Sequence, residues 1–325
     1  MIVNSAVRGF IKRRKNDGIY AVVLCALFVH RLMPRRLGLL VFKILGAVAY
    51  CFPNRERTRT NEHLRAIFAG QWPEKKIRSA ARHVYRELGK NAFDAVYFAR
   101  CDKEQLESNV LCDDLGEFRQ AYALGRGVVA ITAHCGCFEM LLHYFAAQGF
   151  CSFAIGKEVY DKRLDRLVTA MRSGPNITYL YRSQNPRAII RLLREGRLMG
   201  ALIDQDTNVD GVFAHFLGKL AYTPSAPVKL AMHYDIPVFV VTTARQENGT
   251  HRIFVSGRIA LRKTGDETYD LVKNVELVNS HISAAIMKSP TQWVWMHRRW
   301  KRQPDDEGFK DVPNIEKYEG IRKRR

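Results

Sequence analysis

The sequence lacks the features that define several common protein classes. It has no Cys-x-x-Cys pair, and its seven cysteines are odd in number, which argues against a disulfide framework and against a structural zinc site. It has no internal repeat and no low-complexity segment. It also has no uninterrupted apolar run of the roughly 20 residues that a membrane-spanning helix needs. These absences favour a globular chain in a reducing compartment.

Acidic residues are scarce relative to basic ones. The chain has 52 Lys and Arg against 32 Asp and Glu, a formal net charge of +20. Such an excess attracts phosphate-rich partners, so nucleic acid and an anionic membrane are both candidates. Basic clusters border apolar segments, as PRR does at 34–36. This placement favours a membrane surface, because each such residue contributes about 1 kcal/mol near anionic headgroups.

Two apolar segments lie near the N-terminus, at 19–29 and 37–52. The first is about half the length of a span and the second carries Lys43. No small-residue cleavage site follows the first, so a secretory signal is not expected. The pattern favours helices that anchor the chain at the membrane interface, and a soluble helix pair packed on the core is the alternative. We therefore expect an anchoring segment at 1–55 and an α/β domain at 56–325.

The rest of the chain alternates between strand and helix patterns. Strands are predicted at 126–134, 151–156, 177–181, 198–204, 237–245 and 251–259. Helices are predicted at 74–100, 137–149, 162–173, 186–196, 225–234 and 269–288. This alternation predicts an α/β fold with a central mixed, mostly parallel sheet flanked by helices.

The stretch ITAHCGCFEM at 131–140 contains two candidate catalytic residues, His134 and Glu139. On a straight helix they would lie about 140° apart, on different faces. They meet only if His134 precedes the helix and Gly136 forms the turn, an arrangement that the predicted strand and helix supply. A histidine so placed is typical of a general base acting on a hydroxyl, with the carboxylate fixing its tautomer. A structural histidine at a strand end is the alternative.

Two other chemistries remain open for this stretch. A thiol site would use Cys135 or Cys137 as the nucleophile, but adjacent side chains on a turn usually point apart, so Cys135 is poorly placed to share a proton with His134. A metal site would combine His134 with nearby carboxylates. It lacks the two-His spacing of the common zinc helices.

Further polar residues are expected at neighbouring strand ends, where ligands bind in open α/β sheets. Asp204 and Asp206 follow the strand at 198–204 and are the carboxylates that the metal hypothesis would add. Arg172 and Arg182 flank a Gly/Pro/Asn break, and either could bring a permanent positive charge into the site.

Three blocks in the same order resemble a known family. They are GRGVVAITAHCGCFE at 125–139, ALIDQD at 201–206 with GVFAHFLGKLAYTPSAPVKLA at 211–231, and QWVWMHRRWKRQP at 292–304. Together they resemble the late acyltransferases of lipid A biosynthesis, the lauroyl/myristoyl type within the HX4E acyltransferase superfamily. The resemblance covers most of the chain.

The resemblance implies that His134 is the general base and Glu139 its partner, and that Arg172 and Asp204 support the site or position the substrate. It also implies an acyl chain delivered by acyl carrier protein, a hydroxyl of a lipid A precursor as acceptor, and no metal or other cofactor. The expected location is the cytoplasmic face of the inner membrane, with N-terminal anchoring on anionic lipid, and nucleic acid is not an expected partner. Cysteines on both sides of Gly136, and Leu217, depart from the family's usual residues, which bears on acyl-chain and acceptor preference.

Two alternative functions stay open at this stage. One is an acyltransferase of the same superfamily that acts on another glycolipid or on a lysophospholipid. The other is a non-catalytic basic protein that binds membrane or nucleic acid, for which Trp293, Trp295 and Trp300 would serve as stacking residues. The same tryptophans also suit a packed helix end or a membrane interface.

Overall fold

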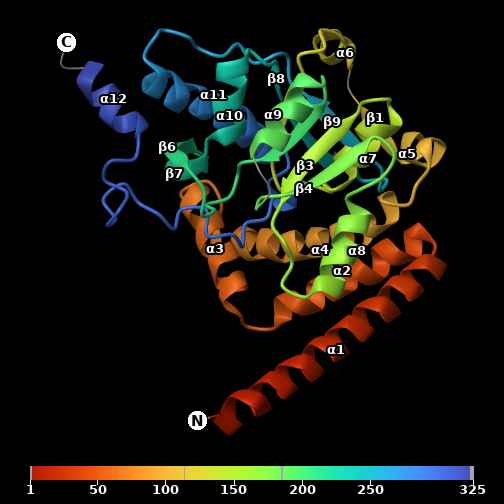
Figure 1. Ribbon diagram of the computed structural model, residues 1–325. Coiled ribbons are helices and arrows are strands. Elements are labelled where there is room, and N and C mark those ends of the chain that lie inside the picture. Colours follow the sequence, from red (N-terminus) through yellow and green to blue (C-terminus); the bar gives the residue numbers. More distant parts are fainter. Residues whose placement is uncertain (1, 113, 184–185, 323–325) are drawn as a thin grey trace.

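A computed structural model describes residues 2–112, 114–183 and 186–322. Its centre is a seven-stranded sheet with helices on both faces (Figure 1). In spatial order the strands are β1 (Val110–Cys112), β9 (His251–Val255), β8 (Val238–Arg245), β2 (Val128–Thr132), β5 (Leu198–Leu202), β3 (Ser152–Gly156) and β4 (Ile177–Tyr181).

The predicted mixed, mostly parallel α/β sheet is confirmed. Strands β8, β2, β5, β3 and β4 are parallel to one another, and β9 is antiparallel to β8. The sheet is buried on both faces, as parallel sheets usually are: alternate residues of β2 enter two separate apolar clusters. Val129 and Ile131 join a cluster with α10 (Ala226–Tyr234) and α11 (Glu267–Lys288). Val128 and Ala130 join one with α6 (Gly116–Ala123) and α7 (Met140–Ala147).

The predicted helices form close to their expected positions, and several short elements were not predicted. The helices after the first two are α3 (Arg55–Ile67), α4 (Glu74–Phe98), α5 (Lys103–Asn109), α6 (Gly116–Ala123), α7 (Met140–Ala147), α8 (Lys162–Met171), α9 (Pro186–Arg194), α10 (Ala226–Tyr234), α11 (Glu267–Lys288) and α12 (Ile315–Arg322). A separate hairpin consists of β6 (Gly211–Phe216) and β7 (Lys219–Pro224).

The register between β2 and β5 creates the site. These strands are parallel neighbours, with Thr132 opposite Leu202. Position 134 is two residues past the end of β2 and position 204 is two residues past the end of β5, so the chain brings His134 and Asp204 to the same edge of the sheet. Polar residues at the carboxyl ends of neighbouring parallel strands are the usual ligand-binding arrangement of such sheets.

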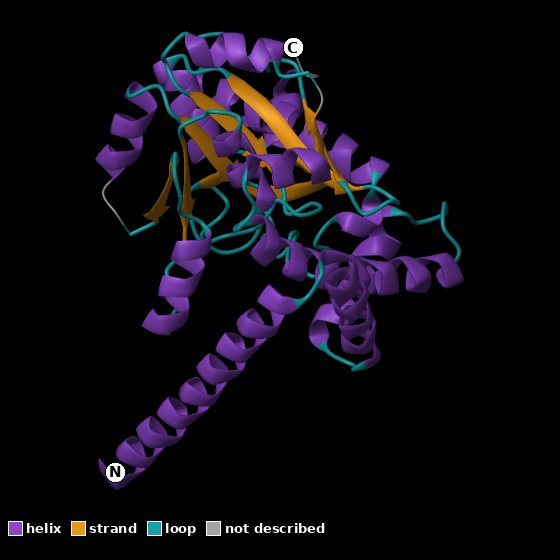
Figure 2. Ribbon diagram, turned by 90° about the vertical axis from the view of Figure 1, so that its right-hand side faces the viewer, coloured by secondary structure: helices purple, strands orange, loops and turns teal. Residues whose placement is uncertain are grey.

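The two N-terminal helices differ in how they contact the body. Helix α1 (Ile2–Leu32) projects away from it (Figure 2), whereas α2 (Arg35–Cys51) lies along α4 (Figure 1). Two glycines allow this close packing. A methyl group on Gly46 of α2 would overlap the Tyr85 carbonyl, and one on Gly89 of α4 would overlap the Phe42 carbonyl. The helix pair is therefore held by backbone contact along α2.

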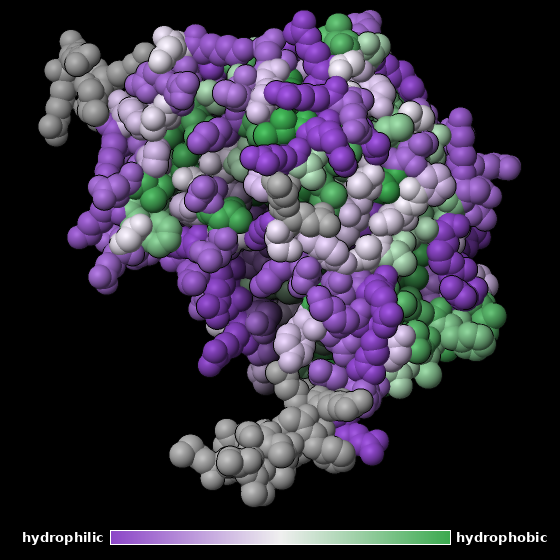
Figure 3. Space-filling model, viewed as in Figure 1, coloured by the Kyte–Doolittle hydropathy of each residue, from purple (hydrophilic) through white to green (hydrophobic). Residues whose placement is uncertain are grey.

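The outward face of α2, and that of α1 from Ile19 onward, is apolar. Part of this surface forms the green patch at the lower right of Figure 3. Its exposed large side chains are Ile19, Val22, Leu24, Phe28, Val29, Leu32, Leu37, Leu40, Ile44, Leu45, Val48 and Phe52. Within the described ranges, no single helix has the length and apolar content of a membrane span. Helices α2 and α3 reach that threshold only as a pair, which is bent by 91°.

A buried ionic cluster joins α2, α4 and the sheet. The carboxylate of Asp94, which is fully buried, accepts hydrogen bonds from Arg35 (2.9 and 2.8 Å), from Arg245 and from His251 (2.8 Å). Burial alone would raise the pKa of Asp94, but the hydrogen bonds from His251 and Arg35 and the charge of Arg245 hold it well below its usual value. Asp94 is therefore ionised and fully paired.

Replacing Asp94 by asparagine is expected to lower the free energy of unfolding by about 3–5 kcal/mol, because breaking a buried pair leaves uncompensated charge behind. Urea unfolding followed by tryptophan fluorescence measures this loss. Asp235 is the matched control, since it pairs with Arg126 and Lys263 on the surface and its side chain is 58% exposed. Its asparagine variant should lose far less stability, because exposed ion pairs contribute little. Equal losses in both variants would contradict a structural role for the cluster.

Candidate active site

His134 is held by Asp204 through both its backbone and its ring. The His134 backbone N–H donates to Asp204 Oδ2 at 2.9 Å, and Nδ1 donates to Asp204 Oδ1 at 2.8 Å. A carboxylate can only accept, so the Nδ1 nitrogen carries the proton. This arrangement leaves Nε2 as the basic nitrogen of the ring. The His134 side chain is 19% exposed and lines a cavity.

The Asp204 carboxylate is completely buried and fully ionised. Burial alone would raise its pKa, but the charge of His134 and hydrogen bonds from His134 and Trp293 lower it to about 2. The Trp293 indole N–H donates to Oδ2 at 2.8 Å. A buried carboxylate with this set of donors orients the imidazole and stabilises the imidazolium that forms when Nε2 takes a proton.

The structure corrects the predicted pairing of His134 with Glu139. The Glu139 carboxylate instead accepts two hydrogen bonds from Arg172, one from Nε at 2.9 Å and one from Nη2. Burial alone would lower the pKa of Arg172, but the hydrogen bonds to Glu139 outweigh it and raise that pKa above its ordinary value. Glu139 and Arg172 therefore form an ion pair joined by two hydrogen bonds. His134 takes its carboxylate from the neighbouring strand.

Gly136 forms the tight turn between His134 and Glu139, as predicted. Its φ is 55°, in the left-handed region, and a methyl group there would overlap the Thr243 carbonyl. The turn is held from two sides. Its N–H donates to the Gln292 carbonyl at 2.9 Å, and its carbonyl accepts from Asn91 Nδ2 at 2.9 Å. The position of this turn is therefore set by residues far away in the sequence.

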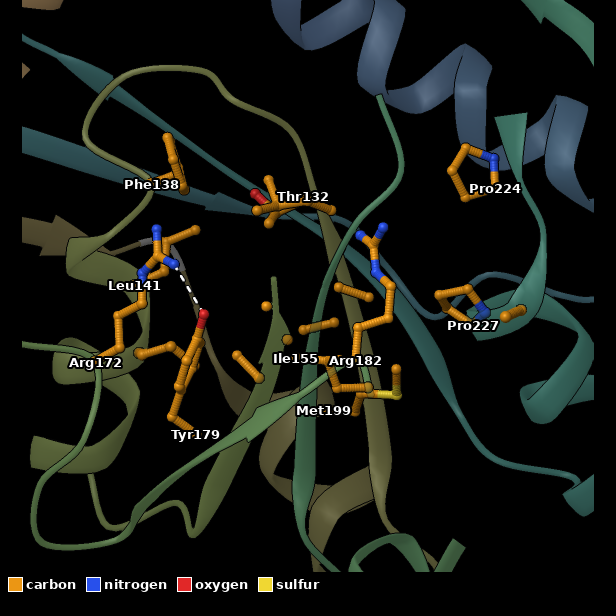
Figure 4. Close-up of a pocket in the computed structure, with 18 of the residues that line it drawn as sticks. Thr132, Phe138, Leu141, Ile155, Arg172, Tyr179, Arg182, Met199, Pro224 and Pro227 are labelled. Atoms are coloured by element: carbon orange, nitrogen blue, oxygen red, sulfur yellow. Dashed lines mark hydrogen bonds between the residues drawn. The ribbon is translucent and has the colours of Figure 1, made fainter. Parts of the chain in front are cut away.

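A cavity of about 420 Å³ opens beside this cluster, along the sheet surface covered by α7. Most of its lining is apolar and comes from β2, β3, β5 and α7. Polar groups enter at a few points, namely Thr132, His134, Glu139, Arg172, Tyr179, Arg182, Gln205 and Thr207. In Figure 4 the Arg172 and Tyr179 side chains meet on one side, while Arg182 reaches in from another. Such a cavity suits a hydrocarbon chain with a polar reacting end.

The thiol and metal hypotheses gain no support from the geometry. All seven cysteines, each within the described ranges, are free. Burial raises the pKa of Cys135 to about 12 and raises that of Cys137 as well, so neither thiol supplies a thiolate near neutral pH. No three His, Cys, Asp or Glu side chains gather as metal ligands among the residues that the structure describes.

The C-terminal tryptophan and arginine block at 292–304 contacts the site residues and their neighbours. Trp293 and Trp295 are buried, which agrees with a packing role. The Val294 N–H donates to the His134 carbonyl at 3.2 Å, and Arg302 binds Asp206 at 3.0 Å. The hydrogen bond from Trp293 to Asp204 is not predicted from the sequence. One sequence signal points to this contact. Trp293 lies in a block that resembles a family signature.

A basic imidazole nitrogen beside an apolar cavity suits an α/β enzyme that modifies a hydroxyl on a hydrocarbon-bearing substrate. Comparison with known proteins narrows this class. Residues 11–302 match the family described as "Bacterial lipid A biosynthesis acyltransferase". The chain belongs to that family and is an acyltransferase.

Two curated relatives have the same degree of similarity. The chain is 23% identical over 267 residues to the "Lipid A biosynthesis palmitoleoyltransferase" of Escherichia coli (strain K12), covering 80% of this chain and 83% of the relative. The "Lipid A biosynthesis acyltransferase" of Shigella flexneri matches with the same identity and coverage.

Proposed function

We propose that the protein transfers a fatty acyl group from the thioester of acyl carrier protein to a hydroxyl of a lipid A precursor. The observation that carries this proposal is the His134–Asp204 pair at the edge of an apolar cavity. Burial of the acyl chain against the apolar lining of the cavity stabilises the complex by about 0.8 kcal/mol for each methylene. Family membership supports the acceptor class.

In this mechanism His134 Nε2 takes the proton of the acceptor hydroxyl as its oxygen attacks the thioester carbonyl. The C–O bond forms, the C–S bond breaks, and the proton passes from the imidazolium to the departing thiolate. Asp204 holds the ring and offsets its transient charge. The acyl group moves directly between the two substrates, and the protein's own groups supply the acid and the base.

The Glu139–Arg172 pair contributes fixed geometry and charge. His143 of α7 contacts the Met171 carbonyl through Nε2 at 2.9 Å, next to Arg172 at the end of α8. Glu139 and this contact together hold the guanidinium at the cavity wall. There its charge favours the developing negative charge of the reaction.

Glu139→Gln is expected to lower kcat by about 100-fold, since small displacements of positioning groups have effects of that size. The expected loss of activity arises because the variant removes the charged partner that holds Arg172 in place. Steady-state transfer assays measure the change. Glu158→Gln is the control, because Glu158 is exposed and binds Lys162 on the surface, and it should retain activity. Comparable losses in both variants would refute a specific role for the Glu139–Arg172 pair.

We also propose that residues 1–55 anchor the enzyme at the cytoplasmic face of the inner membrane and that 56–325 form the catalytic domain. The exposed apolar side chains of α1 and α2 support this location, as they suit insertion into the headgroup boundary. The net charge of +20 suits both anionic lipid and an acidic carrier protein. No metal or other cofactor takes part in the proposed mechanism.

Incubation of the purified protein with acyl carrier proteins of several chain lengths and a lipid A precursor tests the function. Mass spectrometry of the lipid should show the added acyl group on a hydroxyl. Parallel reactions with a glycosylated lipid lacking the phosphorylated disaccharide, and with a lysophospholipid, test the alternative acceptors. Acylation of one of those instead of the lipid A precursor would replace the proposed acceptor.

A further inference from the structure

The Tyr179 hydroxyl is a donor group of the cavity that the mechanism has not yet used. Tyr179 lies in β4, and its side chain lines the cavity. Its hydroxyl oxygen accepts a hydrogen bond from Arg172 Nη1 at 3.1 Å, the dashed line of Figure 4. Among the described residues this is the only hydrogen bond of that hydroxyl. Because the oxygen accepts from Arg172, its own proton remains available for donation.

The fold reserves space for this hydroxyl. A methyl group at Gly156 of β3 would overlap the Tyr179 hydroxyl and ring. Strands β3 and β4 are parallel neighbours, so the missing side chain of Gly156 lets the phenol lie across the sheet edge. A tyrosine that merely filled apolar space would not need its hydroxyl at that point. The position of the hydroxyl is therefore determined on two sides, by Gly156 and by Arg172.

The charges around the hydroxyl make it a strong donor. Arg172 binds Glu139 through Nε and Nη2 and binds Tyr179 through Nη1. A hydroxyl that accepts from a cation becomes a better donor to its next partner, because hydrogen bonds in a chain polarise one another. The positive charge of Arg172 therefore polarises the Tyr179 hydroxyl, and this hydroxyl can donate a hydrogen bond to a group in the cavity.

We propose that Tyr179 is a catalytic residue that donates a hydrogen bond to the carbonyl oxygen of the acyl thioester. This inference rests on the proposed function. When the acceptor oxygen attacks, the C=O π electrons move to the carbonyl oxygen, and the Tyr179 O–H stabilises that oxyanion. The electrons then re-form C=O as the thiolate leaves. Tyr179 keeps its proton throughout, and His134 carries the proton that is transferred.

Tyr179→Phe removes this donor and retains the ring. Removal of one oxyanion donor lowers kcat by about 100- to 1,000-fold, and KM for the acyl donor should change little. Tyr181→Phe is the matched control on the same strand. The Tyr181 hydroxyl binds Asp165 (2.6 Å) and Thr169 (2.8 Å), and this variant should keep nearly full kcat. Unchanged kcat in Tyr179→Phe overturns the proposal.

A second measurement separates a direct contact from an effect through Arg172. Each protein is assayed with the thioester and with the matching dithioester. In the dithioester, sulfur replaces the carbonyl oxygen, and sulfur is a weaker hydrogen-bond acceptor. The quantity compared is the rate with the thioester divided by the rate with the dithioester. If the Tyr179 hydroxyl contacts the carbonyl oxygen, this ratio should be at least about tenfold lower in Tyr179→Phe than in the unaltered protein. It should stay the same in Tyr181→Phe. A lower kcat with an unchanged ratio would make Tyr179 a positioning residue and overturn the proposal.

The activity of the unaltered protein distinguishes failure of the proposed function from failure of the proposed role of Tyr179. If it transfers no acyl group to any lipid hydroxyl, the proposed function fails together with the role of Tyr179. If it transfers the group and Tyr179→Phe behaves like Tyr181→Phe, the function stands and only the role of Tyr179 fails. The expected result is transfer by the unaltered protein and by Tyr181→Phe, with a large loss confined to Tyr179→Phe.

Discussion

His134→Ala is expected to reduce the rate of acyl transfer by about 100- to 10,000-fold, the range that a positioned general base contributes. The variant loses the imidazole held by Asp204, whereas the cavity lining is otherwise retained. Quantitative mass spectrometry of the acylated lipid over long incubations measures the residual rate. Binding of the lipid acceptor should be nearly unchanged, because the imidazole acts mainly in the transition state.

His297 provides the matched control for this variant. Its ring centroid lies 5.5 Å from that of His134, and its Nε2 is 2.6 Å from the Gln205 amide. Burial, followed by the charge of His134, lowers the pKa of His297 to about 4, so at neutral pH it is an uncharged structural neighbour. His297→Ala should therefore lose far less activity. A residual rate for His134→Ala within tenfold of the unaltered protein would rule out His134 as the base.

Asp204→Asn is expected to lower kcat by about 1,000- to 10,000-fold with little change in fold, because an amide can donate to Nδ1 and stabilise the wrong tautomer. The pKa of Asp204 is lowered to about 2 by its partners. The carboxylate is then ionised at every pH between 5 and 9. The loss in Asp204→Asn should accordingly be large throughout that range, as a pH series of kcat measurements would reveal.

Asp206→Asn is the control for loss of a buried negative charge. Asp206 lies two residues further along the same segment, and its carboxylate binds Arg302 instead of His134. Thermal unfolding of both variants separates stability from catalysis. If Asp204→Asn keeps a third or more of the activity while Glu139→Gln loses it, Glu139 is the partner of His134, as the sequence predicts.

The sequence predicted where the polar residues lie better than it predicted which of them meet. His134 and Asp204 were both expected at strand ends, and the β-branched runs before them do form β2 and β5. Their pairing depends on strand order, and β3 and β4 lie between β2 and β5 in the chain but outside them in the sheet. No local pattern encodes that order. Proximity in sequence favours Glu139 as the partner, whereas the strand order brings Asp204 to His134.

Tyr179 escaped detection for a related reason. It stands in ITYLY at 177–181, which reads as an apolar strand, and nothing in that run distinguishes Tyr179 from Tyr181. The difference comes from Gly156 on the neighbouring strand and from Arg172 at the end of α8. Short elements were missed as well, since the three residues of β1 and the β6–β7 hairpin give too little periodicity to identify.

The contact between Arg35 and the loop after β8 has a consequence for the order of events during synthesis. Arg35 donates to the Gly249 carbonyl at 2.8 Å, across 214 residues of chain. At translation rates of about 5–20 residues per second, that partner emerges roughly 10–40 seconds after Arg35. During this interval α2 exists without Gly249, and its apolar face is exposed. The outward apolar face of α2 stays exposed after the last strands arrive, so lipid that covers this face during synthesis would also cover it in the folded protein.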